Sequence, residues 1–108
     1  MSVYLIAQLG MNDDSWVPDY ASHVHDIVHK HNGKYLSRSA NVTPLEGDAP
    51  ADIIAIVQFP TLADAEAFAG DPDYAPYKDA RRAGTNSVFC VIDDTDVAGT
   101  IPYLAPGG

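Results

Sequence analysis

The chain alternates short apolar runs with segments of helical periodicity, and this order constrains its fold more than any other feature. Val3–Leu9 is a run of β-forming residues that ends at Gly10. In Trp16–His31 the apolar residues fall on one arc of a helical wheel, whereas the polar residues occupy the rest. Lys34–Val42 then predicts a second strand. The first part of the chain therefore predicts a strand–helix–strand unit.

The same order follows a second time. Its expected elements are a strand over 52–59, a helix over 62–69, a second helical piece from 71 to about 82 and a strand over 86–92. The complete βαββαβ order predicts an α+β, ferredoxin-like fold, in which both helices cover one face of a four-stranded antiparallel sheet.

Polar residues and glycines indicate where these helices begin and end. Residues 12–15 supply N-cap candidates for the first helix, and Asn32-Gly33 supplies its stop because Gly tolerates the left-handed conformation. Thr61 is the expected N-cap of the helix that follows it. Asp71-Pro72 is expected to open the last helical piece, with Asp as cap and Pro in the first turn.

A sheet with helices on one face leaves its other face uncovered. Because an apolar sheet face of this size is rarely exposed, we expect a second copy to cover it in a symmetric homodimer. The domain is expected over residues 1–93. Residues 94–108 form a C-terminal tail whose apolar island, Ile101–Leu104, is expected to contact the partner subunit.

Composition narrows the classes of function. With 6 Lys plus Arg against 15 Asp plus Glu, the net charge is −9, which disfavours both nucleic acid and anionic membranes as partners. No apolar run approaches the roughly 20 residues of a membrane span, and no signal peptide is recognised. The single cysteine, Cys90, is expected to be inert core in an apolar strand, and a cytoplasmic location is expected.

Three segments, in order, resemble the domain-of-unknown-function 1330 family. Residues 31–38 (HNGKYLSR) are similar to its HGGRYLxRGG stretch, and residues 57–62 (VQFPTL) are similar to its VIEFPS segment. Residues 71–74 (DPDY), followed by Tyr77 and Arg81, resemble its SPEYQ…R helix. The resemblance covers about Val3 to Ile92. It implies the dimeric α/β-barrel fold, with a cavity between sheet and helices, of a superfamily that includes cofactor-free monooxygenases of antibiotic biosynthesis, lactone isomerases and haem-degrading enzymes.

The chain departs from the family pattern at three places. Asn32 stands where the family has the first glycine of a pair, and Ser39-Ala40 replaces two further glycines. Gln58 replaces a glutamate, which removes a possible catalytic base.

Four histidines lie on the first predicted helix. His25 and His29 have the i, i+4 spacing of a metal pair, but they lie on the polar arc with no third ligand beyond Asp26, so a solvated face is the preferred interpretation and no metal is expected. His31 projects from the apolar arc near the helix C-terminus, where the helix dipole favours imidazolium. His23 lies at the other edge of that arc.

The candidate ligand-binding residues are polar strand residues and amphipathic aromatics. Arg38 and Gln58 are expected either to bind a ligand or, for Arg38, to form an ion pair with Asp52 or a partner subunit; which sheet face they occupy is left open. The residues expected to line a cavity for a phenolic or polycyclic compound, with core packing as the alternative, are Trp16, Tyr20, Tyr74, Tyr77 and Arg81.

These residues lead to a functional hypothesis. The chain is expected to be a small-molecule enzyme without a tightly bound cofactor, of oxygenase, cyclase or isomerase type, acting on an aromatic or enolisable metabolite in secondary metabolism. Arg38 with Gln58 or Asn86 would stabilise an oxyanion, and His31 or His23 would move the proton. A non-catalytic ligand-binding or accessory dimer is the alternative, and a haem protein with a helix histidine as axial ligand is a third.

Overall fold

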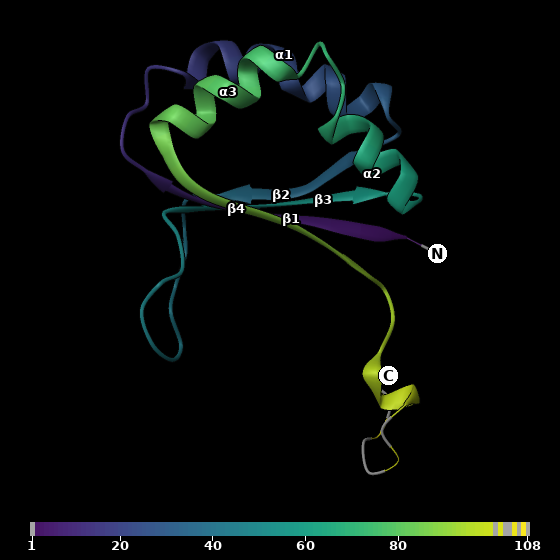
Figure 1. Cartoon of the computed structure of the whole chain (residues 1–108). Helices are drawn as coiled ribbons and strands as arrows, with labels where there is room; N and C mark the ends of the chain where they lie inside the picture. Colours follow the sequence, from purple (N-terminus) through teal and green to yellow (C-terminus); the bar gives the residue numbers. More distant parts are fainter. Residues whose placement is uncertain (1, 101, 103–104, 106, 108) are drawn as a thin grey trace.

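The computed structural model, which describes residues 2–100, 102, 105 and 107, has one four-stranded antiparallel sheet in the order β2-β3-β1-β4, with helices above one face (Figure 1). Its strands are β1 (Val3–Met11), β2 (Lys34–Ser39), β3 (Ile53–Phe59) and β4 (Thr85–Asp93). Its helices are α1 (Val17–Lys30), α2 (Leu62–Ala69), α3 (Ala75–Gly84) and the short 3₁₀ helix η1 (Val97–Gly99). The predicted α+β, ferredoxin-like fold is confirmed.

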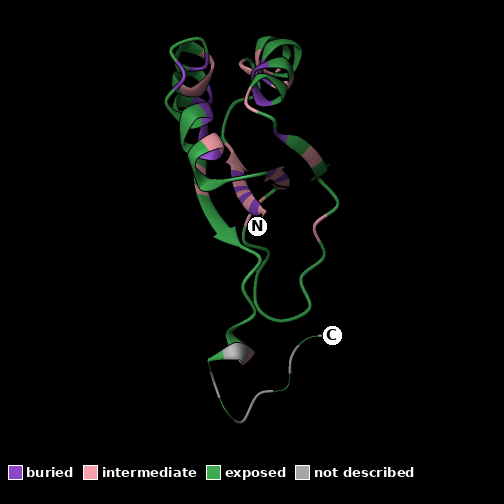
Figure 2. Ribbon diagram, turned by 90° about the vertical axis from the view of Figure 1, so that its right-hand side faces the viewer, coloured by how far each residue is buried: buried purple, intermediate pink, exposed green. Residues whose placement is uncertain are grey.

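The two faces of the sheet differ in burial because side chains alternate along each strand. In β1 the side chains beneath the helices are buried, namely Val3, Leu5, Ala7 and Leu9. Figure 2 shows that buried segments gather in the part of the molecule that carries the helices, whereas most of the loop after β2 and residues 94–97 are exposed. The core therefore lies between the helices and one face of the sheet, and the other face is here called the open face.

The open face is largely apolar. Strand pairing places on it Tyr4, Ile6, Ile54, Ile56, Val88, Cys90 and Ile92. Val88 is 60% exposed and Ile92 is 56% exposed. Cys90 pairs with Ile6 and is exposed, so the prediction that it lies in the core is wrong. The apolar run around Cys90 gave no sign of which face it would occupy.

The first helix begins and ends differently from the prediction. No side chain caps α1 at its start. The segment before it is held through its backbone, since the amides of Asn12 and Asp13 both donate to the carbonyl of Gly84 at the end of α3 (3.0 Å each). At the other end Asn32 takes the left-handed conformation (φ 66°), not Gly33. The Gly33 amide donates to the Val28 carbonyl (2.9 Å), which closes a Schellman motif with Asn32 as C′.

The last helix begins later than predicted. Asp71-Pro72 opens a turn rather than α3: the Asp71 carbonyl accepts from the Tyr74 amide (3.0 Å) and its carboxylate accepts from the Asp73 amide (2.8 Å). The proline in the first turn of α3 is Pro76. By contrast, Thr61 caps α2 as predicted, since its hydroxyl accepts from the Asp64 amide (3.1 Å).

A β-bulge in β2 changes which side chains face the helices. Tyr35 pairs with Val57, Ser37 pairs with Ile56 and Arg38 pairs with Ala55, so one extra residue lies between Tyr35 and Ser37. Tyr35 and Arg38 consequently lie on the same, helix-covered face. Strict alternation along a strand would place these two residues on opposite faces, but the bulge shifts the register by one.

Three predictions remain: that the chain has no membrane span, that the apolar island contacts a partner subunit, and that the chain divides into a domain and a tail. Within the described residues, no helix is both long and apolar enough to cross a membrane. Of the apolar island at 101–104, residues 101, 103 and 104 lie outside the described residues, so its contact with a partner stays a prediction, as does the division into domain and tail.

Candidate functional site

A cavity of about 200 Å³ lies between α1 and the sheet. Its walls are aliphatic and aromatic side chains from α1, α2 and all four strands. At its floor Ala7 pairs with Ala55 in the middle of the sheet, and these two small side chains leave space that larger residues would fill. Among the described residues that line it there is no carboxylate. The site is therefore apolar in its body, and its polar groups lie at a few defined points.

The charged end of this cavity is formed by Arg38 and His25, one from β2 and one from α1. Arg38 Nη2 lies 2.9 Å from His25 Nδ1, and the guanidinium carbon lies 4.0 Å from the centre of the Tyr35 ring. The His25 ring stacks on Tyr35 with centroids 5.4 Å apart and an angle of 10°. Because a guanidinium can only donate, Nδ1 must accept, so His25 in this contact is neutral with its proton on Nε2. The three side chains thus form a stacked group with a permanent positive charge.

The hydroxyl-bearing aromatics of the cavity stay protonated. Burial raises the pKa of Tyr20, and the neighbouring Tyr74, whose hydroxyl lies 3.0 Å from that of Tyr20, raises it further. Burial also raises the pKa of Tyr35, while the charge of Arg38 acts in the opposite direction. At neutral pH these groups therefore offer hydroxyl donors to a bound molecule.

Trp16 forms part of the wall next to Tyr20. Its indole Nε1 donates to the Asp13 carbonyl (2.7 Å), and its ring meets Tyr20 edge-on at 5.1 Å. A Cβ at Gly84 would lie 2.5 Å from Trp16 Cδ1, so only glycine permits this close approach of α3 to the indole. Trp16 and Tyr20 therefore both line the cavity, and their binding of a ligand stays a prediction.

Two predicted partners of Arg38 lie elsewhere. Gln58 and Asn86 occupy the open face, where Gln58 Nε2 donates to the Ser2 hydroxyl (2.9 Å) and Asn86 pairs with Gly10. They cannot join Arg38 in the cavity of the same chain, because the sheet lies between them. The ion pair proposed for Arg38 with Asp52 is not formed either, since the Asp52 carboxylate accepts from the Met11 amide (2.8 Å).

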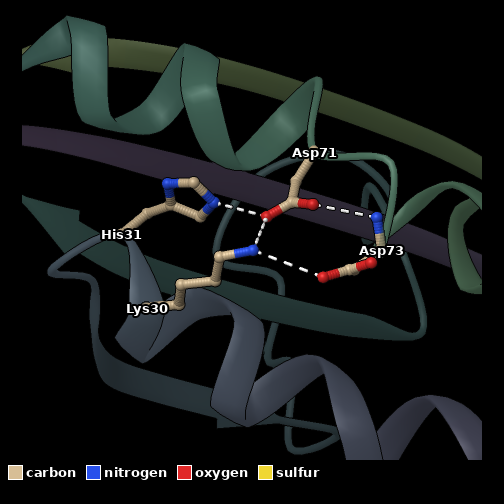
Figure 3. Close-up of polar contacts among 4 residues, drawn as sticks. All are labelled: Lys30, His31, Asp71 and Asp73. Atoms are coloured by element: carbon tan, nitrogen blue, oxygen red, sulfur yellow. Dashed lines mark hydrogen bonds and ion pairs between the residues drawn. The ribbon is translucent and has the colours of Figure 1, made fainter.

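His31 binds a carboxylate outside the cavity. Its Nε2 lies 2.7 Å from Asp71 Oδ2, which also accepts from Lys30 Nζ at 2.9 Å (Figure 3). Lys30 Nζ lies 3.3 Å from Asp73 as well, and the Asp71 side chain is only 5% exposed. The Lys30 ammonium first, then His31 and the Asp73 amide, hold the pKa of the Asp71 carboxyl well below its ordinary value. This cluster joins the end of α1 to the turn before α3.

Replacing Asp71 by Asn is expected to lower the melting temperature by about 5 °C at pH 7, since the uncharged amide loses the ion pair with Lys30 and weakens the contact with His31. Because the pKa of folded Asp71 is depressed, its stabilisation is present above the ordinary value of 3.8 and is lost as the pH falls below it. The difference between wild type and variant, measured by circular dichroism, should therefore shrink below pH 4. Asp73→Asn, at an exposed partner of Lys30, is the control and should change the melting temperature less. A difference that stays constant down to pH 2 would contradict this assignment.

The remaining predicted residues surround the cavity without lining it. His23 is exposed, its Nδ1 lies 2.8 Å from the Asp19 carbonyl, and its ring stacks on Tyr77 with centroids 5.0 Å apart. Tyr74 is buried behind Tyr20, and Arg81 is buried beside Tyr74. The structure thus brings Arg38, Trp16 and Tyr20 together and leaves His23 and His31 outside.

His25 is the residue that sequence reasoning missed. The i, i+4 spacing of His25 and His29 was interpreted as a pair of solvated side chains, and the two rings lie 4.3 Å apart. Over residues 2–100 no group of three or more His, Cys, Asp or Glu side chains is placed to hold a metal ion. The sequence does contain a signal that places His25 at the cavity, because Ala21, His25 and Val28 have the i, i+4, i+7 spacing of one helix face. All three residues line the cavity.

The family profile described as "Domain of unknown function (DUF1330)" matches residues 2–95. The chain belongs to this family. The resemblance found in the three sequence segments is therefore confirmed over most of the DUF1330 chain, while the description itself assigns no activity. No curated protein sequence matches the chain.

Solved structures share the fold of this DUF1330 chain at low sequence identity. RPA0582, a protein of unknown function from Rhodopseudomonas palustris, is 14% identical over 88% of this chain and 83% of its own, with a TM-score of 0.74. SnoaB, a cofactor-independent oxygenase from Streptomyces nogalater, is 11% identical over 88% of this chain and 94% of its own, with a TM-score of 0.63. A dimeric ferredoxin-like protein of unknown function from Thermobifida fusca is 15% identical over 85% and 90%, with a TM-score of 0.52.

Proposed function

We propose that this chain is a small-molecule enzyme without a tightly bound cofactor, of oxygenase, cyclase or isomerase type, acting on a compact aromatic or enolisable metabolite. The observation that carries the proposal is the apolar cavity with Arg38 and His25 at one end. Its volume of about 200 Å³ is below the roughly 300–1,000 Å³ of drug-sized ligand sites, so it suits a molecule of one to three rings. The fold shared with a cofactor-independent oxygenase supports the reaction class by analogy.

In this proposal the chain divides binding and chemistry between two sets of residues. The aromatic and aliphatic walls, including Trp16 and Tyr20, hold the body of the substrate. Arg38 stabilises the oxyanion of a phenolate or enolate as it forms, because its charge cannot be neutralised by loss of a proton. His25 accepts the proton in place of the predicted His31 or His23, which lie outside the cavity.

The contact between Arg38 and His25 sets the order of events. While Arg38 donates to Nδ1, that nitrogen cannot accept a proton. A substrate oxygen that takes the guanidinium as its own donor releases Nδ1, which then becomes the base next to the oxygen it deprotonates. In an oxygenase reaction the resulting carbanion or enolate supplies the electrons that reduce O₂, so no redox cofactor is required.

The ionisation of a bound phenol tests the role of Arg38 without knowledge of the natural substrate. 2-Naphthol is expected to bind to the wild type with its own pKa lowered by about one unit, because Arg38 favours the naphtholate. Arg38→Met should instead raise it, since an apolar cavity disfavours the anion. The absorption spectrum of naphtholate, recorded against pH, measures the pKa of bound 2-naphthol in both proteins. Naphthol that ionises in the wild-type complex as it does in water would overturn the assignment of Arg38.

Oxygen uptake with naphthols and naphthalenediols then tests catalysis. His25→Asn keeps an acceptor for Arg38 but cannot carry a proton, so it should bind 2-naphthol normally and lower the rate by about 100-fold or more. Equal rates for wild type and His25→Asn would exclude His25 as the base. His29→Asn makes the same change at the exposed histidine one helical turn after His25, and is therefore the matched control.

A non-catalytic ligand-binding or accessory protein is the second candidate. It is favoured by the absence of any carboxylate among the described cavity residues and by the engagement of His25 Nδ1 with Arg38. Binding of naphthols without oxygen uptake or isomerisation across the panel would favour it over the enzyme. Haem binding has weaker support, because the cavity is smaller than a tetrapyrrole.

The homodimer is part of the same proposal. The open face is apolar, and both the loop after β2 and the first residues of the tail extend on that side of the sheet (Figure 1). Sedimentation at micromolar concentration should give the mass of two chains, and Ile6→Glu should shift it to one because it places a charge at the centre of the face. Ala67→Glu, on the exposed side of α2, adds the same charge on the helix-covered side of the sheet and is the control. A single-chain mass for the wild type would contradict the dimer.

A further inference from the structure

A second cavity, of about 170 Å³, lies between α2, α3 and the edge strand β4. It shares the side chains of Leu5, Phe68 and Phe89 with the walls of the first cavity. Its charged lining residues are Glu66, Lys78 and Arg81, none of which lines the first cavity. It is thus a separate space with charges of its own.

Arg81 is the unusual member of this lining, because it is a buried cation whose hydrogen-bond partners and stacked ring are all neutral. The residue is 3% exposed. Its Nη1 donates to the Ser87 hydroxyl (2.6 Å), its Nη2 lies 3.4 Å from the Tyr74 hydroxyl, and the guanidinium lies 3.9 Å above the Phe89 ring. Its buried Nε has no hydrogen-bond partner in the described part of the chain.

No carboxylate forms an ion pair with Arg81 among the described residues, although the chain has 15 acidic residues and 6 basic ones. A guanidinium cannot give up its proton, so burial without an anion carries an uncompensated cost. Lys78 adds a second positive charge to the cavity, with its Nζ 3.5 Å from the Ala69 carbonyl. Glu66 is exposed and pairs with neither of them.

We propose that this second cavity binds a small organic carboxylate with an aromatic or aliphatic body. The carboxylate lies against Arg81, whose unused Nε and planar fork suit two carboxylate oxygens, and Lys78 adds charge at the same site. The body of the ligand packs on Phe68 and Phe89. A phosphate fits less well, because one buried guanidinium supplies too few donors for its oxygens. This site does not depend on the function proposed for the first cavity.

Calorimetry in a chloride-free buffer at pH 7 tests the site with benzoate and its uncharged analogue benzamide. The wild type should bind benzoate at least tenfold more tightly than benzamide. Arg81→Met, which keeps an apolar side chain of similar length, should weaken benzoate binding by tenfold or more. Arg82→Met removes the same charge from the exposed neighbour on α3 and should leave binding unchanged.

Two further variants distinguish benzoate binding at Arg81 from binding in the first cavity and from a purely structural role of this arginine. Arg38→Met removes the cation of the first cavity, which also attracts an aromatic anion, so this variant should keep the benzoate site that Arg81→Met loses; loss of all benzoate binding in Arg38→Met, with binding retained in Arg81→Met, would overturn the proposal. Arg81→Lys keeps the charge without the fork, so it should retain the preference for benzoate at lower affinity. Without ligand, Arg81→Met should melt at or above the wild-type temperature. No benzoate binding by the wild type, together with a marked loss of stability in Arg81→Met, would show that Arg81 is purely structural.

Discussion

Replacing Gly33 by Ala is expected to lower the free energy of unfolding by about 3 kcal/mol, a large effect for one methyl group. The added Cβ would lie 2.5 Å from Val28 Cγ1 and 2.7 Å from Phe59 Cε1. Val28 is 1% exposed and Phe59 is fully buried, so neither side chain can move aside without disturbing the core. Urea unfolding followed by circular dichroism measures the change.

Gly70→Ala is the matched control for this substitution. At Gly70 the nearest atom to an added Cβ is the Glu66 carbonyl oxygen at 3.5 Å, and φ is −97°, which alanine adopts readily. The control should therefore be neutral or slightly stabilising. Equal unfolding free energies for Gly33→Ala and Gly70→Ala would show that the end of α1 does not pack on β3 as described.

Replacing Ala55 by Leu is expected to abolish binding of 2-naphthol while leaving the fold as stable as the wild type or more so. The larger side chain would occupy the floor of the first cavity, where Ala55 pairs with Ala7 and with Arg38. Burying the added methylene groups contributes about 1–2 kcal/mol where space exists, and the same space is lost to the ligand. Calorimetry should show at least a tenfold weaker affinity, and thermal unfolding should show an unchanged or raised midpoint.

Ala67→Leu, on the exposed side of α2, adds the same atoms away from the cavity and should leave binding unchanged. A variant at Ala55 that unfolds at a lower temperature would mean that the floor is already packed. Unchanged binding by a stable Ala55→Leu protein would place the naphthol site outside this cavity.

The order of elements was readable from the sequence because each element has its own local signal. The apolar arc of α1, the Thr61 cap of α2 and the Ile- and Val-rich β3 all depend on residues that are neighbours along the chain. The predictions were wrong where a contact with a residue far away in the sequence determined the local structure. Asp71 was expected to cap a helix, but its carboxylate binds Lys30 and His31, which are 41 and 40 residues away in the sequence.

The candidate site was only partly predictable for the same reason. The sequence indicated Arg38, Trp16 and Tyr20 by residue type and periodicity, but it favoured His31 over His25 because His31 lies on the apolar arc of the helix. The bulge in β2 turns Arg38 toward α1, where His25 meets it. Gln58 and Asn86 were grouped with Arg38 because a strand position alone does not show which face a side chain occupies.

The sequence by itself determined that this chain forms strand–helix–strand units with helices on one side of a sheet, and it placed the chain in its family. Periodicity, caps and breakers are local, so they act before any distant contact forms. Only the tertiary structure decided which side chains meet. His25 meets Arg38 above the alanine floor of the first cavity, and Arg81 is buried with no acidic partner among the residues that the structure describes. Those contacts depend on register, and one extra residue in β2 changes the register of every side chain that follows it in that strand.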